Sequence, residues 1–348
     1  MKNHLAFVTL VMGTACSAVI TTPRAQAAPA DRPYKIVQTA QYPGSGGIDY
    51  VFADSDERKL YVPRGGEVLV FDLDTLKAAG TIPNTRARGV AVDPVSHHGF
   101  SSSSPVAMWD TRTLAPIKTI EVKGRPDGIL FEPATRRVFV FSHSAPNVTV
   151  IDAQDGTVAG TIDLGGAPEQ AASDGKGRLY VDLEDKDMVA VVDVKALTVT
   201  GRYGFDGKGG TPAGLALDRE NGILFAFCRN PQVCVVLNAA DGKIVTALPI
   251  GRGSDGGLFN PHTKEAFSSQ GDGTLTVIKE NSPTSFSVSQ TVETKSRAKT
   301  CTLDLKKDRI VLITTEPMPG TSDSAEPAKG KKGGNAGPSL LDILVVAR

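Results

Sequence analysis

The chain has 348 residues, of which 40% are hydrophobic, 22% are charged and 6% are aromatic, and it contains 36 glycines and 22 prolines. Lys and Arg together number 38, Asp and Glu also number 38, and the formal net charge is zero. This balance does not favour a nucleic-acid-binding protein, because neutralisation of phosphates normally requires a basic excess or a basic stripe. Abundant glycine without a long helical pattern favours many short strands joined by tight turns.

The N-terminal segment has the features of an export signal. A basic residue precedes an apolar run over residues 5–20, and Ala-Gln-Ala at 25–27 supplies a small-x-small cleavage site. We expect residues 1–27 to be a bacterial signal peptide that is cleaved after Ala27, which predicts a periplasmic or secreted protein. Lipoprotein anchoring at Cys16 is the less favoured alternative, because the residue three positions upstream is glycine. The run is too short for a membrane span, and no other segment is apolar enough for one.

Two series of strand-like segments recur along the rest of the chain. In the first, an apolar strand ends in a polar or small residue, at Asp72, Asp110, Asp152, Asp193, Asn238, Lys279 and Ala347, with spacings of 38, 42, 41, 45, 41 and 68 residues. In the second, a short strand ends just before another β-rich strand, at Asp54, Asp93, Glu132, Asp174, Asp218, Asn260 and Asp304. Both series have seven copies, and a fixed period of about 40 residues is typical of a repeat built from one small sheet. The acidic residues that end the first series are expected to accept backbone N–H groups of the following turn.

The repeats predict a seven-bladed β-propeller with four-stranded antiparallel blades over residues 28–348. One unit cannot bury both faces of its sheet, whereas radial stacking buries them and leaves only short edges. The seventh unit lacks a fourth strand, and a spare strand at residues 34–40 precedes the first unit. We expect this N-terminal strand to complete the last blade and close the ring.

The long spacing in the seventh unit contains an insertion at residues 317–339 that is rich in Pro, Gly, Ser and Lys. This composition predicts a flexible segment without a packed core. One hypothesis is that the insertion is a tether or partial lid over the channel mouth. The alternative is a neutral surface insertion.

Several segments resemble a known repeat. The segment VIDAQDGTVAGTIDLGGAPEQAASDGKGRLYV at 150–181 is similar to the extracytoplasmic YVTN/YncE-like β-propeller repeat, and the segments at 124–141 and 210–227 resemble it as well. The resemblance implies the propeller fold. It implies no catalytic residue, because the repeat occurs in binding proteins, surface proteins and parts of enzymes. A single Trp109-Asp110 dipeptide does not make a WD repeat.

Candidate ligand-binding residues lie in loops that a propeller brings to one face. Loops from a fourth strand to the next first strand share this face with loops from second to third strands, around the channel mouth. The predicted binding residues are Arg86, Arg88, Arg125, Asp127, Glu169, Arg252, Asp255 and Arg297. The other charged residues and the one histidine predicted in the same loops are Arg64, His143, Glu184, Asp185, Lys186, Asp187, Arg229, Asp272 and Lys299. Arginines beside carboxylates suit an anionic or zwitterionic ligand, and the alternative is that these charges pair with one another.

No catalytic motif, metal-ligand set or cofactor fingerprint is recognised, and we expect no cofactor. His97, His98 and His262 are predicted in loops on the opposite face, and His143, alone on the mouth face, does not make a metal site by itself. Cys228 and Cys234 flank a short turn, and a disulfide between them is left open.

The sequence therefore favours an extracytoplasmic, non-enzymatic binding or interaction scaffold, with an unidentified protein or a small anionic ligand as its partner. Two alternatives stay open. One is a metal-dependent, lactonase-like hydrolase with its site at the channel mouth. The other is an accessory partner in a periplasmic redox or cell-envelope complex. Single-stranded nucleic acid is not favoured, because it requires exposed aromatic residues beside arginines.

Overall fold

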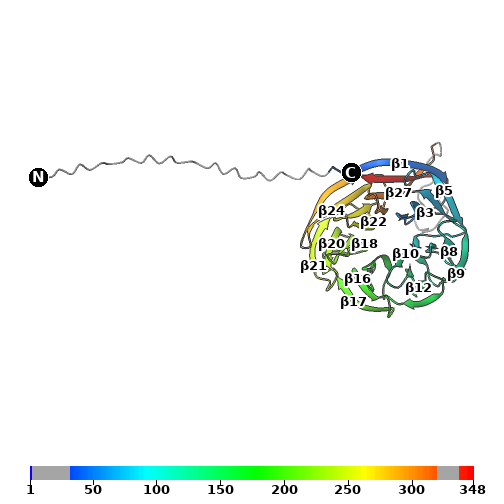
Figure 1. Cartoon of the computed structure of the whole chain (residues 1–348), viewed down its shortest axis with the longest axis horizontal. Coiled ribbons are helices and arrows are strands. Elements are labelled where there is room, and N and C mark those ends of the chain that lie inside the picture. The colour runs from blue at the N-terminus through cyan, green and yellow to red at the C-terminus, as the bar shows by residue number, and fades with distance from the viewer. Residues whose placement is uncertain (2–31, 320–336) are drawn as a thin grey trace. The chain divides into compact units, whose positions relative to one another are not determined.

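The computed structural model describes residue 1, residues 32–319 and residues 337–348. Residues 2–27 of the predicted signal peptide and most of the 317–339 insertion lie outside the described residues. Pro33–Arg348 is one compact unit, and its described part contains 28 strands in seven four-stranded sheets. Figure 1 shows the sheets arranged radially around a common axis. The prediction of a seven-bladed propeller with four-stranded antiparallel blades is confirmed.

Blade one is the first complete set of four consecutive strands, and the blades follow in chain order. The strands are β1 (Lys35–Gly44); in blade one β2 (Phe52–Asp54), β3 (Lys59–Arg64), β4 (Glu67–Asp72) and β5 (Ala78–Pro83); in blade two β6 (Val90–Asp93), β7 (His98–Ser101), β8 (Val106–Asp110) and β9 (Pro116–Ile120); in blade three β10 (Pro126–Glu132), β11 (Arg137–Ser142), β12 (Val148–Asp152) and β13 (Val158–Ile162); in blade four β14 (Pro168–Ser173), β15 (Arg178–Leu183), β16 (Met188–Asp193) and β17 (Thr198–Gly204); in blade five β18 (Pro212–Asp218), β19 (Ile223–Arg229), β20 (Gln232–Asn238) and β21 (Ile244–Pro249); in blade six β22 (Ser254–Asn260), β23 (Glu265–Gln270), β24 (Thr274–Ser282) and β25 (Ser285–Glu293); and in blade seven β26 (Thr300–Asp304), β27 (Arg309–Pro317) and β28 (Ser339–Ala347). No helix long and apolar enough to cross a membrane occurs in the described ranges.

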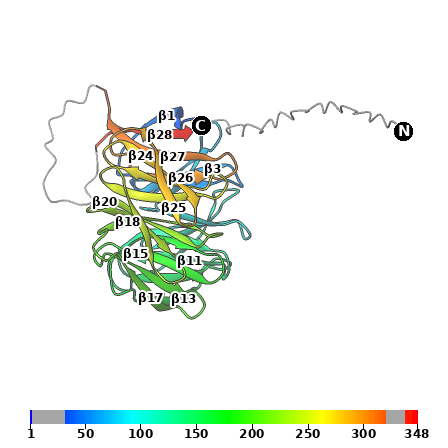
Figure 2. The ribbon, with the colours of Figure 1, turned by 90° about the vertical axis from the view of Figure 1, so that its left-hand side faces the viewer.

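The ring closes through its N-terminal strand. The sheet of blade seven has the order β26-β27-β28-β1, and β1 runs antiparallel to β28 from Lys35 opposite Ala347 to Gly44 opposite Ser339. Figure 2 shows β1 beside β28 in the side view of the ring. The predicted closing strand is confirmed, and it extends four residues beyond the predicted end at residue 40.

The hydrophobic core lies between the blades. Among the described residues there are seven clusters of buried side chains, and each lies between two successive blades, including blades seven and one. Because successive side chains of a strand point to opposite faces of the sheet, each strand contributes to the interfaces with both neighbouring blades. In β11, Phe139 and Phe141 pack toward blade four, while Val138 and Val140 pack toward blade two. Both faces of each blade are therefore buried, as the repeat argument requires.

The turns after the third strands form as their sequences predict. Asp72 Oδ1 accepts the backbone N–H groups of Asp74 and Thr75, at 3.1 and 2.7 Å. Equivalent hydrogen bonds begin the turns after Asp110, Asp152, Asp193 and Asn238. These polar residues therefore have a local structural role on the face opposite the candidate site.

Candidate functional site at the channel mouth

Bulges at the start of the innermost strands direct side chains toward the axis of the propeller. In β10, two residues, Asp127 and Gly128, lie opposite the single residue Phe141 of β11. The same irregularity occurs at Glu169 in β14 and at Asp255 in β22. A bulge of this kind locally breaks the pairing and redirects a side chain. Glycine follows the bulged residue in blade three because a Cβ at Gly128 would meet the backbone oxygen of Glu169 at 2.6 Å.

Seven equivalent positions form what we call the inner ring. Each lies five residues before the polar residue at the end of the first strand of its blade. These polar residues are the second of the two series in the sequence, from Asp54 to Asp304. The inner ring consists of Asp49, Arg88, Asp127, Glu169, Ala213, Asp255 and Lys299. Six of the seven, all except Ala213, line the mouth of the channel. Four carboxylates therefore face two cations at this level.

A chain of ion pairs runs around the inner ring. Arg88 lies 2.9 Å from Asp49 and 3.6 Å from Asp127. On the other side, Arg229, the last residue of β19, pairs with Asp255, which also pairs with Lys299. The alternative that the loop charges pair with one another thus describes most of the inner ring. These contacts hold the carboxylates in fixed positions around the mouth.

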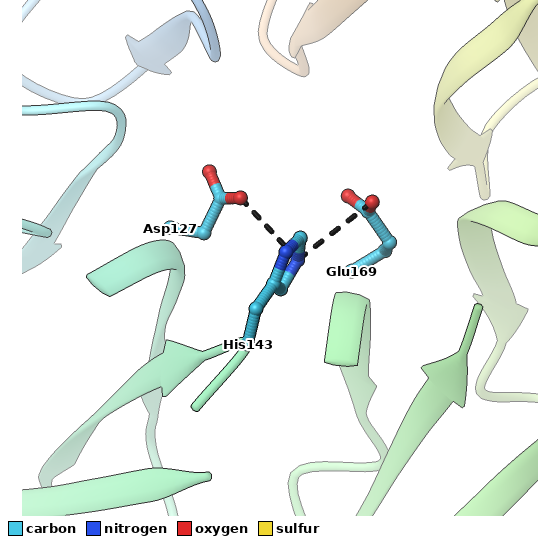
Figure 3. Close-up of side chains that lie close together, drawn as sticks. All are labelled: Asp127, His143 and Glu169. Atoms are coloured by element: carbon cyan, nitrogen blue, oxygen red, sulfur yellow. Dashed lines mark ion pairs between the residues drawn. The ribbon is translucent and has the colours of Figure 1, made fainter. Parts of the chain in front are cut away.

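His143 lies between two of the inner-ring carboxylates. Its Nε2 atom is 3.3 Å from Asp127 Oδ2 and 3.7 Å from Glu169 Oε1. Figure 3 shows the two carboxylates approaching the imidazole from opposite sides. The Tyr50 hydroxyl donates to Glu169 Oε2 at 3.2 Å. One imidazole and two carboxylates from two adjacent blades therefore converge, whereas His143 was predicted from the sequence to lack metal-binding partners.

Burial changes the acidity of these groups. It raises the pKa of Glu169 to about 9, and a hydrogen bond with Glu184 and the charge of Glu184 add to the effect, while Arg229 opposes it. Burial and then the charge of Asp49 raise the pKa of Asp127. Burial also lowers the pKa of Lys299. Burial thus makes the charged forms of Asp127 and Glu169 costly unless neighbouring cations compensate them.

The mouth opens into an apolar channel. The mouth cavity has a volume of about 830 Å³, and the channel beyond it has a volume of about 880 Å³. Tyr50 and Glu169 line both cavities. Apolar side chains of the innermost strands line the channel, including Val90, Ile129 and Leu258. The arrangement offers a charged entrance above an apolar interior.

The structure places the predicted site residues in two groups. Arg88, Asp127, Glu169, Asp255 and Arg297 line the mouth cavity. Arg86, Arg125 and Arg252 are exposed on the surrounding loops and do not line it. Asp49 and Tyr50 also line the mouth cavity, and neither was predicted from the sequence. Counting back five residues from each strand-ending polar residue would have found Asp49, because it is equivalent to Asp127 and Glu169.

The three histidines predicted on the opposite face make local contacts there. His97 Nδ1 lies 2.8 Å from Glu57, and His262 Nδ1 lies 2.8 Å from Asp308. His98 Nδ1 lies 2.9 Å from the backbone oxygen of Ala153.

The disulfide left open by the sequence is not formed. Cys228 and Cys234 are both free and buried. In the β19–β20 pairing, Cys228 lies opposite Val233 and Cys234 lies opposite Phe227. Because of this offset of one residue, Cys228 packs between blades four and five, and Cys234 packs between blades five and six. The two thiols therefore point to opposite faces of the sheet.

Comparisons with known proteins identify the fold. No protein-family model matches the chain, and no curated protein matches it. A chain in the crystal structure of the mitotic checkpoint complex is 14% identical with a TM-score of 0.69, and the match covers 86% of this chain and 96% of that one. The structure of the RRP9 WD40 repeats is 11% identical with a TM-score of 0.66, and the match covers 87% of this chain and 97% of that one. At these identities the likeness concerns architecture, and the chain is a seven-bladed β-propeller.

Proposed function

We propose that this protein is an extracytoplasmic, non-enzymatic binding scaffold of the YVTN/YncE-like propeller type, and that it binds an anionic ligand on the face of the channel mouth. The observation that carries the proposal is a set of four exposed arginines around the inner ring. We call Arg86, Arg125, Arg252 and Arg297 the rim arginines.

The rim arginines differ from the inner-ring cations in their partners. Arg88, Arg229 and Lys299 each pair with a carboxylate, whereas no rim arginine makes a side-chain ion pair with a residue in the described ranges. All four lie in loops that lead from a fourth strand into the next first strand. Guanidinium groups bind carboxylate or phosphate oxygens with two parallel hydrogen bonds. The rim is therefore suited to an anion, while the rigid strands below hold the loops in place.

Location and family rest on sequence features. The export signal at residues 1–27 supports a periplasmic or secreted protein, and the segment at 150–181 supports the YVTN/YncE-like type. A mature chain that starts at residue 28 and is recovered from the periplasmic fraction is the expected result. Recovery of a full-length chain from the cytoplasm would contradict this part of the proposal.

The ligand proposal is tested with citrate and pyrophosphate as small polyanions. Isothermal titration calorimetry compares the mature protein with a variant in which all four rim arginines are replaced by glutamine. We expect binding to weaken by about tenfold or more in the variant and in high salt, because rim charges are screened.

A matched control removes four exposed cations from the turns on the opposite face, Lys77, Arg112, Lys195 and Lys243. It has the same net charge as the rim variant and is expected to bind the anions like the wild type. Equal weakening in both variants would reveal a general charge effect, and no anion binding by the wild type would also overturn the proposal.

The second candidate function is a metal-dependent, lactonase-like hydrolase. The convergence of Asp127, His143 and Glu169 above an apolar channel favours it. A bound metal would supply a water of lowered pKa. Turnover of a lactone panel that requires added metal and is lost in His143→Gln would select this candidate, and absence of turnover with metal bound would leave the scaffold.

A further inference from the structure

We propose that Asp127, His143 and Glu169 form a divalent-metal site in the channel mouth, and that Zn²⁺ is the ion which this donor set favours. The inference uses the same three residues as the second candidate function, but it concerns metal binding and the identity of the ion alone. It does not require that an anionic ligand binds or that a reaction takes place.

The separations of the donor atoms suit one shared ion. Two ligands that bind Zn²⁺ at about 2.0–2.1 Å with a tetrahedral angle lie about 3.4 Å apart. His143 Nε2 is 3.3 Å from Asp127 Oδ2 and 3.7 Å from Glu169 Oε1. All three donor atoms lie within 4.8 Å of one another, so a small rotation of one carboxylate brings them around a common centre. Loop charges that only form separate pairs would not bring three donor atoms so close together.

The surroundings of the imidazole nitrogen are a second observation that supports the site. His143 Nε2 is buried, and its contacts with the two carboxylates do not have hydrogen-bond geometry. A buried nitrogen between two carboxylates is costly unless a proton or a metal ion satisfies it. Glu169 is held beside it with only 9% of its side chain exposed. Together, the two residues resemble a prepared ligand set more than an exposed acidic cluster.

Neighbouring cations do not fill the position between the donors. Arg88 lies closer to Asp49, at 2.9 Å, than to Asp127, at 3.6 Å. Arg229 pairs with Asp255 and is 4.0 Å from Glu169. Lys299 also pairs with Asp255. The charges of Arg88, Arg229 and Lys299 are thus shared with carboxylates outside the donor set, which reduces their repulsion of an incoming ion.

The chemistry of the donors selects the ion. Imidazole nitrogen suits Zn²⁺ and other transition metals, whereas Ca²⁺ and Mg²⁺ prefer oxygen ligands alone. Three protein ligands leave a fourth tetrahedral position of Zn²⁺ open. The donors line the mouth cavity, so this position would be accessible from the mouth. We therefore expect Zn²⁺ to bind more tightly than Ca²⁺ or Mg²⁺.

The test measures binding of ZnCl₂ to chelator-treated mature protein by isothermal titration calorimetry. We expect one Zn²⁺ per chain, and a loss of affinity of about tenfold or more in each of Asp127→Asn, His143→Gln and Glu169→Gln. Substitution with Co²⁺ gives a second readout, because its visible absorption reports nitrogen and oxygen ligands, and His143→Gln should change that spectrum. Thermal melts confirm that each variant is folded.

The matched control is Asp185→Asn, which removes a negative charge from the same cavity without touching the donor set. It should bind Zn²⁺ like the wild type. A wild type that binds no Zn²⁺, or donor variants that bind it as tightly as the wild type, would overturn the site. Equal weakening by Asp185→Asn would also overturn it, because the effect would then come from the overall charge of the mouth. None of these results decides whether polyanions bind the rim arginines.

Discussion

Single residues show how burial controls reactivity in this propeller. Burial raises the pKa of Cys228 to about 12 and that of Cys301 to about 11, and it raises the pKa of Cys234 well above its usual value. The thiolate is the reactive form of cysteine. These three free thiols, including Cys301, which is only partly buried and lines the channel, should therefore react slowly while the chain is folded.

We predict that iodoacetamide at pH 8 modifies none of Cys228, Cys234 and Cys301 in the native mature protein over a period in which free cysteine reacts fully. In denaturant, all three should be alkylated without prior reduction, because the geometry of the β19–β20 pair separates Cys228 from Cys234. Intact mass spectrometry counts the adducts. Protection of two thiols in denaturant that disappears after reduction would reveal a disulfide and contradict the structure.

A buried carboxylate also depends on its arginine partners. Asp304 ends β26 and is fully buried, and Arg58 of blade one donates to both of its oxygens, at 2.5 and 2.8 Å. Burial by itself raises the pKa of Asp304, but hydrogen bonds from Arg58 and Arg309 outweigh it and leave the pKa below its ordinary value. A lowered pKa in the folded state stabilises the protein above the unfolded pKa of about 3.9. This stability is lost as the pH falls through the folded pKa.

We predict that Arg58→Gln lowers the free energy of unfolding by about 1.5–3 kcal/mol at pH 7, as expected for loss of a hydrogen bond to a charged group. The difference from the wild type should shrink below about pH 4, where Asp304 becomes protonated in the unfolded chain. Urea unfolding at several pH values measures both. The control Arg112→Gln removes an exposed pair with Asp110 and should cost about 0–1 kcal/mol. A pH-independent loss in Arg58→Gln would contradict the ion-pair explanation.

At the scale of elements, β1 is the strand that closes the ring. It covers the edge of β28, and Tyr34 just before it packs against Phe267 and donates a hydrogen bond to Glu265 at 2.7 Å. Without β1, β28 would expose a long edge, which is a template for aggregation. Closure therefore depends on a contact between the two ends of the described propeller.

We predict that deletion of residues 33–44 lowers the melting temperature strongly, because burial of each large apolar side chain contributes about 1.5–3 kcal/mol. A synthetic peptide of residues 33–44 should restore much of the melting temperature by pairing with β28. Thermal unfolding followed by circular dichroism measures the effect, with a scrambled peptide as the control. An unchanged melting temperature after deletion would show that the other strands hold the ring closed.

Bulges in the innermost strands are the second feature at the scale of elements. They interrupt the innermost strands at Asp127, Glu169 and Asp255 and turn these side chains into the mouth. The sequence contains the signal for their shared position, since each lies five residues before a strand-ending polar residue. It does not contain the direction of the side chain, because that direction follows from the pairing with the second strand.

At the scale of the whole molecule, stability is distributed over seven similar interfaces in the described propeller. Each interface holds one cluster of buried side chains, so the core is divided among the seven interfaces. Radial symmetry also brings seven loops to one axis, and the charged mouth forms where they meet. A site of this kind is built by the ring as a whole, because Asp127 of blade three and Asp255 of blade six line the same cavity.

The sequence by itself determined the number of blades, the order of strands and the strand that closes the ring. These features follow from local signals, namely the alternation of apolar residues and the turn-forming residues after each strand, and such signals recur at a readable period. Only the tertiary structure decided which charges meet. His143 joins Asp127 and Glu169, Cys228 turns away from Cys234, and Arg86 stays outside the mouth cavity. These outcomes depend on register, bulges and burial, and all three are set by contacts between strands that are distant in the chain or lie on different blades.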